Sequence, residues 1–290
     1  MSKRKLCLAG VLVSALFATA LYFGPRTLPA DDRPSRYIRP HATSSARTDR
    51  ASINEEVPRR LCEISDGLPG DTDYSADSGR DDARASRQVS SGIGNVGRLL
   101  PLAKRLTTAS LARLDKRFDI GDEELRRAER QIGAVDRVVL DDALDDTASV
   151  DDESPTEIHV GPGYALHLTS DEEALLLLAH ELTHVAAYNN NLRPFIREVA
   201  RVSESRAGVR PTFGQEEDLA CDFLGEQALR RFMGEQHSRL SQAERFALAF
   251  GYDCGAQADG DGDREHLGQA ETLRALLALD PELGQLILSR

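Results

Sequence analysis

Residues 170–187 read SDEEALLLLAHELTHVAA, and this stretch decides the fold because it predicts a buried helix that carries two histidines. Ser170 followed by Glu173 forms a capping box, which is a signature of a helix N-terminus. Residues 174–179 and those that follow Leu182 are almost wholly apolar, and a helix that is apolar nearly all round is buried. We therefore expect an interior helix that begins directly after Ser170.

The same helix carries the pattern H-E-x-x-H as His180, Glu181 and His184. Two histidines four residues apart lie on one face of a helix, one turn from each other, so both imidazoles can bind one metal ion. The glutamate beside the first histidine can reach a water molecule that the metal holds. Histidines satisfied within an ordinary core are the alternative, but a metal offsets the cost of burying three polar groups. We expect one zinc ion, bound by His180 and His184, with Glu181 as the catalytic base.

A catalytic zinc site needs three protein ligands and a water molecule, so one ligand is still missing. Residues 216–222 read EEDLACD, in a predicted second helix. Asp218 and Asp222 are four residues apart and share a face, so Asp218 can bind zinc while Asp222 accepts a hydrogen bond from a ligand histidine. Glu217 is the alternative third ligand, with a longer side chain but a different face from Asp222. An acidic first turn that stabilises the helix dipole would explain Glu217 but not Asp222, which lies among apolar residues.

A strand, H-E-x-x-H on a buried helix, and a second helix with an acidic ligand and an aspartate four residues later resemble the gluzincin metallopeptidases. Residues 138–185 look like the HtpX-like and CAAX-prenyl-protease group. The phrase DLACD at 218–222 is closer to the BlaR/MecR sensor peptidases, whose corresponding phrase begins with glutamate where this chain has Asp218. The resemblance covers about 138–233. It implies a zincin-like domain of the α+β class, mostly helical, with a small sheet and an active-site helix.

The function implied by this resemblance is zinc-dependent hydrolysis of peptide bonds, with a peptide or protein as substrate. The multi-span membrane domain of those families is absent here, so their membrane substrates are not implied. A non-catalytic, zinc-bound sensor or scaffold on a membrane is the alternative from another class, and the general base Glu181 favours the enzyme. Hydrolysis of a non-peptide bond, as in cell-wall material, is a third possibility. The sequence does not indicate an oligomeric state.

Lys3, Arg4 and Lys5 precede an apolar run at 6–23, so residues 1–24 are predicted to be a signal peptide or a signal anchor. The domain is then expected outside the cytoplasm, anchored in the inner membrane and facing the periplasm or extracytoplasmic space, or secreted if the signal is cleaved. The arginines that follow 6–23 argue against this orientation under the positive-inside rule. The net charge of −12, without a basic stripe, makes nucleic acid an unexpected partner.

Residues 25–91 are rich in Ser, Asp, Arg, Pro and Gly and predict a flexible, mostly disordered linker, with a short helix around 53–64 as an interruption. Residues 92–290 are predicted to form the metallopeptidase domain. Its expected elements are helices from 93 and 122, strands at 138–140 and from 158, the histidine helix, a polar connection over 192–214, and helices at 215–233, 241–249 and 269–279.

Four cysteines and two further histidines complete the functional candidates. Cys7 lies in the apolar N-terminal run, and Cys221 is expected to be buried in the second helix. Cys62 and Cys254 remain as a possible disulfide, which an oxidising compartment would permit. The strand near His159 is a candidate for pairing with an extended substrate. His266 is either a polar residue at a helix start or a group that stabilises an oxyanion.

Overall fold

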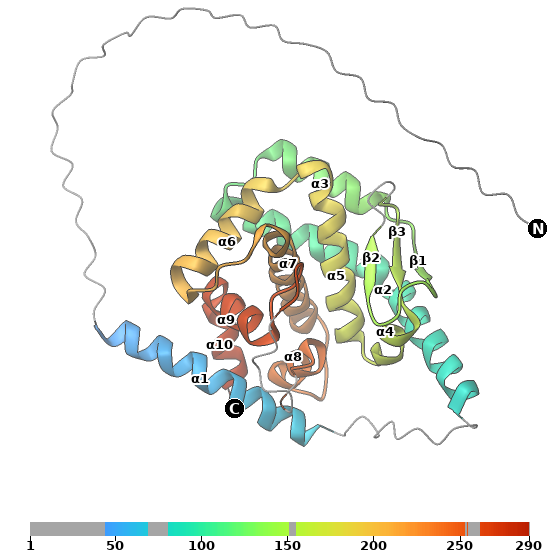
Figure 1. Cartoon of the computed structure of the whole chain (residues 1–290), viewed down its shortest axis with the longest axis horizontal. Helices are drawn as coiled ribbons and strands as arrows, with labels where there is room; N and C mark the ends of the chain where they lie inside the picture. Colours follow the sequence, from blue (N-terminus) through green and yellow to red (C-terminus); the bar gives the residue numbers. More distant parts are fainter. Residues whose placement is uncertain (1–43, 69–80, 151–154, 253, 255–261, 290) are drawn as a thin grey trace, which may run out of the picture. The chain divides into compact units, whose positions relative to one another are not determined.

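The computed structural model describes residues 44–68, 81–150, 155–252, 254 and 262–289, which belong to one compact unit. The unit is mostly helical with one small sheet, as the sequence predicted for the fold class (Figure 1). The helices are α1 (Ser44–Gly67), α2 (Asp81–Phe118), α3 (Asp122–Ala134), α4 (Pro162–His167), α5 (Asp171–Ala187), the 3-10 turn η1 (Tyr188–Asn190), α6 (Arg193–Ala207), α7 (Phe213–Glu235), α8 (Gln242–Phe250), α9 (Gln269–Leu279) and α10 (Pro281–Leu288).

Helix α5 runs through the interior, where it packs against α7, α2, α3 and α8 (Figure 1). The expected capping box opens it: the Glu173 amide donates to Ser170 Oγ at 3.1 Å, and the Ser170 amide donates to Glu173 Oε2 at 2.8 Å. Asn191 closes the other end by donating from Nδ2 to the Ala186 carbonyl at 2.8 Å. Capped at both ends and apolar on most faces, α5 fixes the positions of its two histidines.

The sheet consists of β1 (Arg137–Leu140), β2 (Ala148–Val150) and β3 (Glu157–Val160), in the order β1-β3-β2. Strand β3 pairs with β1 in parallel and with β2 in antiparallel register, so His159 faces Val139 on one side and Ser149 on the other. The prediction that the strand near His159 receives a substrate is therefore wrong, because both edges of β3 are already paired. The edge strands are β1 and β2, and β2 packs beside α5.

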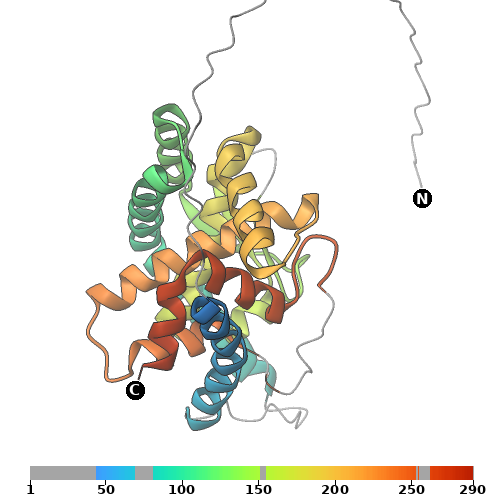
Figure 2. The same cartoon turned by 90° about the vertical axis from the view of Figure 1, so that its left-hand side faces the viewer.

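Helix α1 belongs to the compact unit, and this corrects the expected domain boundary at residue 92. Val57, Leu61 and Ile64 are buried in the core, and α1 packs along α8 and α10 (Figure 2). A disulfide between Cys62 and Cys254 ties α1 to the segment after α8. The apolar residues recur at helical spacing, but the polar composition around them suggested a linker. Of the predicted linker 25–91, residues 44–67 and 81–91 are helical.

Two further predictions need correction in the same way. The expected polar connection over 192–214 contains α6, whose Phe195, Ile196 and Val199 are buried at helical spacing. The short strand β2 is not among the predicted strands at 138–140 and from 158. Both elements matter for the site. Strand β2 packs beside the histidine helix α5, and α6 begins at Arg193, shortly after α5 ends.

The predicted signal or anchor, residues 1–24, lies outside the described residues. Among the helices that the structure describes, none combines the length and the apolar character that crossing a membrane requires.

Removing α1 should destabilise the unit, since its apolar face fills the core. Leu61→Ala should lower the free energy of unfolding by about 2–5 kcal/mol because it leaves a cavity. Arg59→Ala, on the exposed side of the same helix, should change it by less than about 0.5 kcal/mol. Denaturant unfolding of both variants measures this.

A chain that lacks residues 1–42 should melt cooperatively, whereas one that lacks 1–91 should not. Equal stability of the two truncated chains would restore the boundary at 92.

Helix α7 also buries a carboxyl group away from the histidines. Glu226 is 1% exposed, and its Oε1 has no hydrogen-bond partner. Burial raises the pKa of Glu226 to about 8, and the negative charge of Asp280 adds to this, while Arg230 opposes it from 3.8 Å. The folded-state pKa therefore stands above the unfolded value, so this group's contribution to stability is complete below the unfolded pKa and is lost as pH rises through about 8.

Glu226→Gln should remove this loss, since glutamine stays neutral at every pH. The variant should melt at a higher temperature than the parent near pH 9, with little difference near pH 5. Glu282→Gln is the matched control, because Glu282 contacts the same Arg230 but is exposed. Melting temperatures across this pH range test the prediction, and an unchanged pH profile in Glu226→Gln would refute it.

Candidate metal centre

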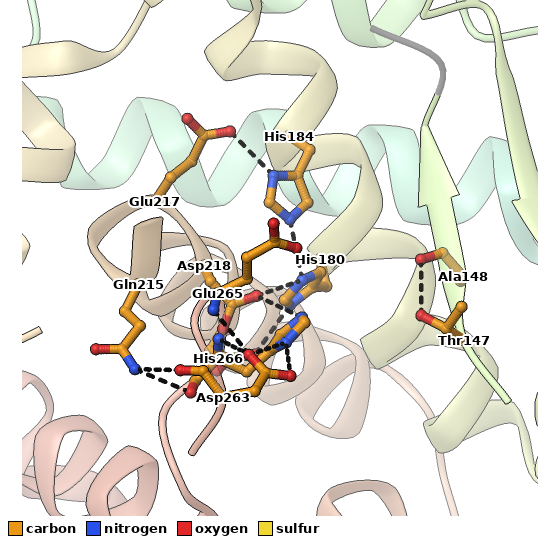
Figure 3. A network of polar contacts seen from close by, with 11 residues as sticks. Thr147, Ala148, His180, His184, Gln215, Glu217, Asp218, Asp263, Glu265 and His266 are labelled. Carbon is orange, nitrogen blue, oxygen red and sulfur yellow. Dashed lines mark hydrogen bonds and ion pairs between the residues drawn. The ribbon is translucent and has the colours of Figure 1, made fainter. Parts of the chain in front are cut away.

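The two histidines of α5 point toward each other, with Nε2 of His180 and Nε2 of His184 3.2 Å apart (Figure 3). Each ring also meets a carboxylate of α7 through its other nitrogen. Asp222 Oδ1 lies 2.9 Å from His180 Nδ1, and Glu217 Oε1 lies 3.0 Å from His184 Nδ1. Carboxylates that accept from Nδ1–H fix the orientation and tautomer of metal-binding histidines. The structure thus gives Asp222 the contact that the sequence argument required.

These contacts favour a cation between the histidines. If each Nδ1 carries the proton that it donates to its carboxylate, both Nε2 atoms are acceptors with lone pairs. Two lone pairs at 3.2 Å repel each other unless a positive charge lies between them. A metal ion or a proton can supply this charge. Burial lowers the pKa of His180, but the adjacent carboxylates of Asp218 and Asp222 outweigh burial and hold it well above the ordinary value.

Asp218 lies beside His180, as the predicted third ligand must. The residue is 6% exposed, and its Oδ1 has no hydrogen-bond partner while lying 3.3 Å from His180 Nε2. Zinc bound to nitrogen or oxygen at about 2.0–2.1 Å in a tetrahedron separates the ligand atoms by about 3.3–3.4 Å. The distances of 3.2 and 3.3 Å around His180 Nε2 match two edges of such a tetrahedron. An unpartnered, buried carboxylate oxygen at this place fits a metal ion.

Cys221 is a second candidate from α7. The structure brings together His180, His184 and the buried Cys221 as a group that could hold a metal ion, with one ligand atom of each within 4.8 Å of the others. We favour Asp218 as the ligand for two reasons. Cys221 is 0% exposed and does not line the cleft, whereas Asp218 does. Burial also raises the pKa of the Cys221 thiol well above its ordinary value, and neighbouring carboxylates add to this, so the thiolate that binds metal is disfavoured.

The two helices approach closely enough for these contacts because α7 has glycine where it crosses α5. A Cβ at Gly225 would lie 3.2 Å from Leu176 Cδ1 and 3.6 Å from the His180 amide nitrogen. A side chain there would therefore require Leu176 to give way by a few tenths of an ångström. Gly225 follows Asp222 by one turn on the same face, so the crossing and the carboxylates are fixed together.

Glu181 lies in the same centre, on the histidine helix α5. It is 5% exposed and lines the cleft together with both histidines. Burial raises the pKa of Glu181, and the histidines lower it in part. A carboxylate with a raised pKa is a stronger base than an exposed one, which is the property that general-base catalysis requires.

The cleft has a volume of about 840 Å³ and runs between the edge strand β2 and the N-terminal turn of α7. Its lining residues include Thr147 to Val150 from β2 and the preceding turn, His180, Glu181, His184 and Tyr188 from the α5 region, Arg193 from α6, and Phe213, Glu217, Asp218, Glu265 and His266. Backbone groups of an edge strand thus lie along a cleft that contains a buried carboxylate and a candidate metal centre.

His266 reaches the cleft from the loop between α8 and α9, rather than from a helix start as the sequence suggested. Its Nε2 lies 3.7 Å from Asp218 Oδ1, and Asp263 accepts from Nδ1 at 3.0 Å (Figure 3). Gln215 of α7 holds this loop by donating from Nε2 to the carbonyls of Asp263 and His266, at 2.8 and 3.1 Å. Gly214 allows the approach, because a Cβ there would meet the Arg264 carbonyl at 2.9 Å.

The sequence argument placed His180, Glu181, His184, Asp218 and Asp222 in one site, and the structure brings all five together. It missed the contact of Glu217 with His184, because Glu217 was considered only as a ligand. It also missed Cys221, although its position between Asp218 and Asp222 was a signal. The loop of His266 and Asp263 could not be placed, since no local pattern indicates where a long loop packs. No protein-family model, curated protein or solved structure matches the chain.

The three α7 carboxylates should differ in their effect on zinc affinity. Asp218→Ala should cause the largest loss, since it removes a ligand. Asp222→Asn and Glu217→Gln should each cost about 10–100-fold, as is typical of groups that orient ligand histidines. Glu216→Gln is the control, because Glu216 pairs with Arg193 at 3.5 Å instead of a histidine. Competition with a chelator of known affinity measures all four.

Cobalt(II) distinguishes the two candidates for the third ligand, since a thiolate bound to cobalt gives an intense charge-transfer absorption in the near ultraviolet. We expect this absorption to be absent from the parent, and Cys221→Ala to bind cobalt normally. A charge-transfer band that disappears in Cys221→Ala would assign the ligand to Cys221 and contradict Asp218.

Proposed function

We propose that the chain is a zinc-dependent metalloendopeptidase with a zincin-like domain, in which His180, His184 and Asp218 hold one zinc ion. Two imidazoles and one carboxylate around an open position are a donor set typical of catalytic zinc. The observation that carries the proposal is Glu181, which is buried, has a raised pKa and lines the cleft beside both histidines. A centre that only senses or stores metal has no need of a general base there.

When bound, zinc supplies a Lewis acid that polarises the substrate carbonyl and makes a water molecule more acidic. Glu181 accepts the proton of the attacking water and passes it to the nitrogen of the leaving amine. Asp222 and Glu217 keep the Nδ1 atoms of both histidines occupied, which leaves Nε2 of each for the metal.

His266 supports the same reaction. Burial lowers the pKa of His266, but the hydrogen bond to Asp263 and the charge of Asp218 raise it above the ordinary value overall. With Nδ1 donating to Asp263, the protonated ring presents Nε2–H at the cleft. There it can stabilise the negative charge that develops on the carbonyl oxygen.

The edge strand β2 is the proposed place for the substrate backbone. An extended peptide adds to an open sheet edge through main-chain hydrogen bonds, which are independent of its sequence. Strand β2 is hydrogen-bonded to β3 along one edge, so its other edge is free, and its residues line the cleft. The substrate class is therefore a peptide or an extended segment of a protein.

An extracytoplasmic location belongs to this proposal. The disulfide between Cys62 and Cys254 supports it, because such bonds persist in oxidising compartments. The apolar run at 6–23 would direct export and, if uncleaved, anchor the chain in the membrane.

Glu181→Gln should retain zinc but abolish turnover, because an amide cannot accept the proton of the attacking water. The test combines zinc quantification with digestion of an unbiased peptide library by the purified parent and variant. Glu173→Gln is a control on the same helix, since Glu173 caps the helix and does not line the cleft. Peptidolysis by a folded Glu181→Gln protein would refute the mechanism. A parent that binds zinc without cleaving any peptide would favour the non-catalytic sensor or a hydrolase of another bond.

A further inference from the structure

Arg193 is a cation in the wall of the cleft with unused hydrogen-bonding capacity. It is the first residue of α6, and its side chain is 22% exposed. The nearest carboxylate is Glu216 Oε2 at 3.5 Å, which does not line the cleft. Within the described part of the chain, the guanidinium makes no hydrogen bond, although it has five N–H donors in a planar fork. Such a fork fits a carboxylate bidentately.

Phe213 provides the surface on which this cation rests. The guanidinium carbon of Arg193 lies 4.8 Å from the centroid of the Phe213 ring. Phe213 also lines the cleft and is 77% exposed, which is unusual for a phenylalanine. Stacking holds the guanidinium plane in place without using its donors, so the donors remain available for a ligand in the cleft.

The charges around the cleft restrict where an acidic group can bind. Among the described lining residues, Arg193 is the cation outside the histidines, and Glu181, Glu217, Asp218 and Glu265 are carboxylates. These carboxylates repel an acidic side chain, so away from the metal centre and His266 it is attracted at Arg193. The site is close to the metal centre, because Glu216 contacts Arg193 while the next residue, Glu217, contacts His184.

We propose that Arg193, held on Phe213, forms a subsite for a carboxylate of the substrate, namely an aspartate or glutamate side chain near the scissile bond. This inference rests on the proposed peptidase function. It predicts an acidic preference at a single substrate position, the one that lies beside Arg193.

The test uses peptide pairs that differ only by Glu or Gln at one position, scanned over both sides of the scissile bond, with amidated C-termini. The purified parent should show a kcat/KM about 10-fold higher for Glu at one position only. Arg193→Met should abolish this preference, and Arg193→Glu should reverse it in favour of Gln. Phe213→Ala should weaken it in part. Arg197→Ala, an exposed arginine one turn further along α6, is the control and should leave it unchanged.

Binding separates this inference from the proposed chemistry. The Glu181→Gln chain should bind the Glu peptide about 10-fold more tightly than the Gln peptide in fluorescence anisotropy, and adding Arg193→Met should remove the difference. This result would support the subsite even if the parent hydrolysed nothing. A parallel set with free C-termini tests whether Arg193 binds a terminal carboxylate instead of a side chain. In that case the Arg193-dependent gain appears only with the peptides that have free C-termini. Equal Glu and Gln values in parent and Arg193→Met, for both cleavage and binding, would overturn the proposal.

Discussion

The crossing of α5 and α7 is the constraint on which the rest of the structure depends. Helix α5 supplies the two imidazoles, and α7 supplies the carboxylates that contact their Nδ1 atoms. Neither set is stable in isolation, because a buried carboxylate or imidazole without a partner costs several kcal/mol. Packing the helices together gives both sets their partners. It leaves the Nε2 atoms of His180 and His184, and Oδ1 of Asp218, available to a metal ion. The site is therefore a consequence of how the core packs.

The remaining elements keep the two helices in this relation. The capping box and Asn191 fix the ends of α5, while α2 and α3 cover its other faces. The sheet buries Ile158 and Val160 in the core and places β2 along the cleft. The loop that carries Asp263 and His266 is tied to α7 through Gln215. The rigid part of the fold thus holds the metal-binding groups, and the segments around it shape access for a substrate.

The sequence predicted what depends on local spacing and missed what depends on tertiary packing. His180, Glu181 and His184 could be placed because one helical turn determines their geometry. Asp218 and Asp222 followed from the same argument. Helix α6 was missed, and α1 was predicted only as a short helix around 53–64 within a linker, since short apolar faces such as Val57 and Leu61 are diluted by charged neighbours. Cys62 and Cys254, 192 residues apart, could not be paired from spacing, because nothing local records which helices lie side by side.

The aspartate at 218 has a physical explanation in the same crossing. Aspartate has a short side chain, so its oxygen comes within 3.3 Å of His180 Nε2 only where α7 lies close to α5. Gly225 permits that approach, since it removes the side chain that would contact Leu176 and the backbone at His180. Asp218, Asp222 and Gly225 are spaced by one turn each and therefore share the face toward α5. A shorter ligand and a smaller residue at the contact compensate each other, and the distance of 3.3 Å from Asp218 to His180 is the result.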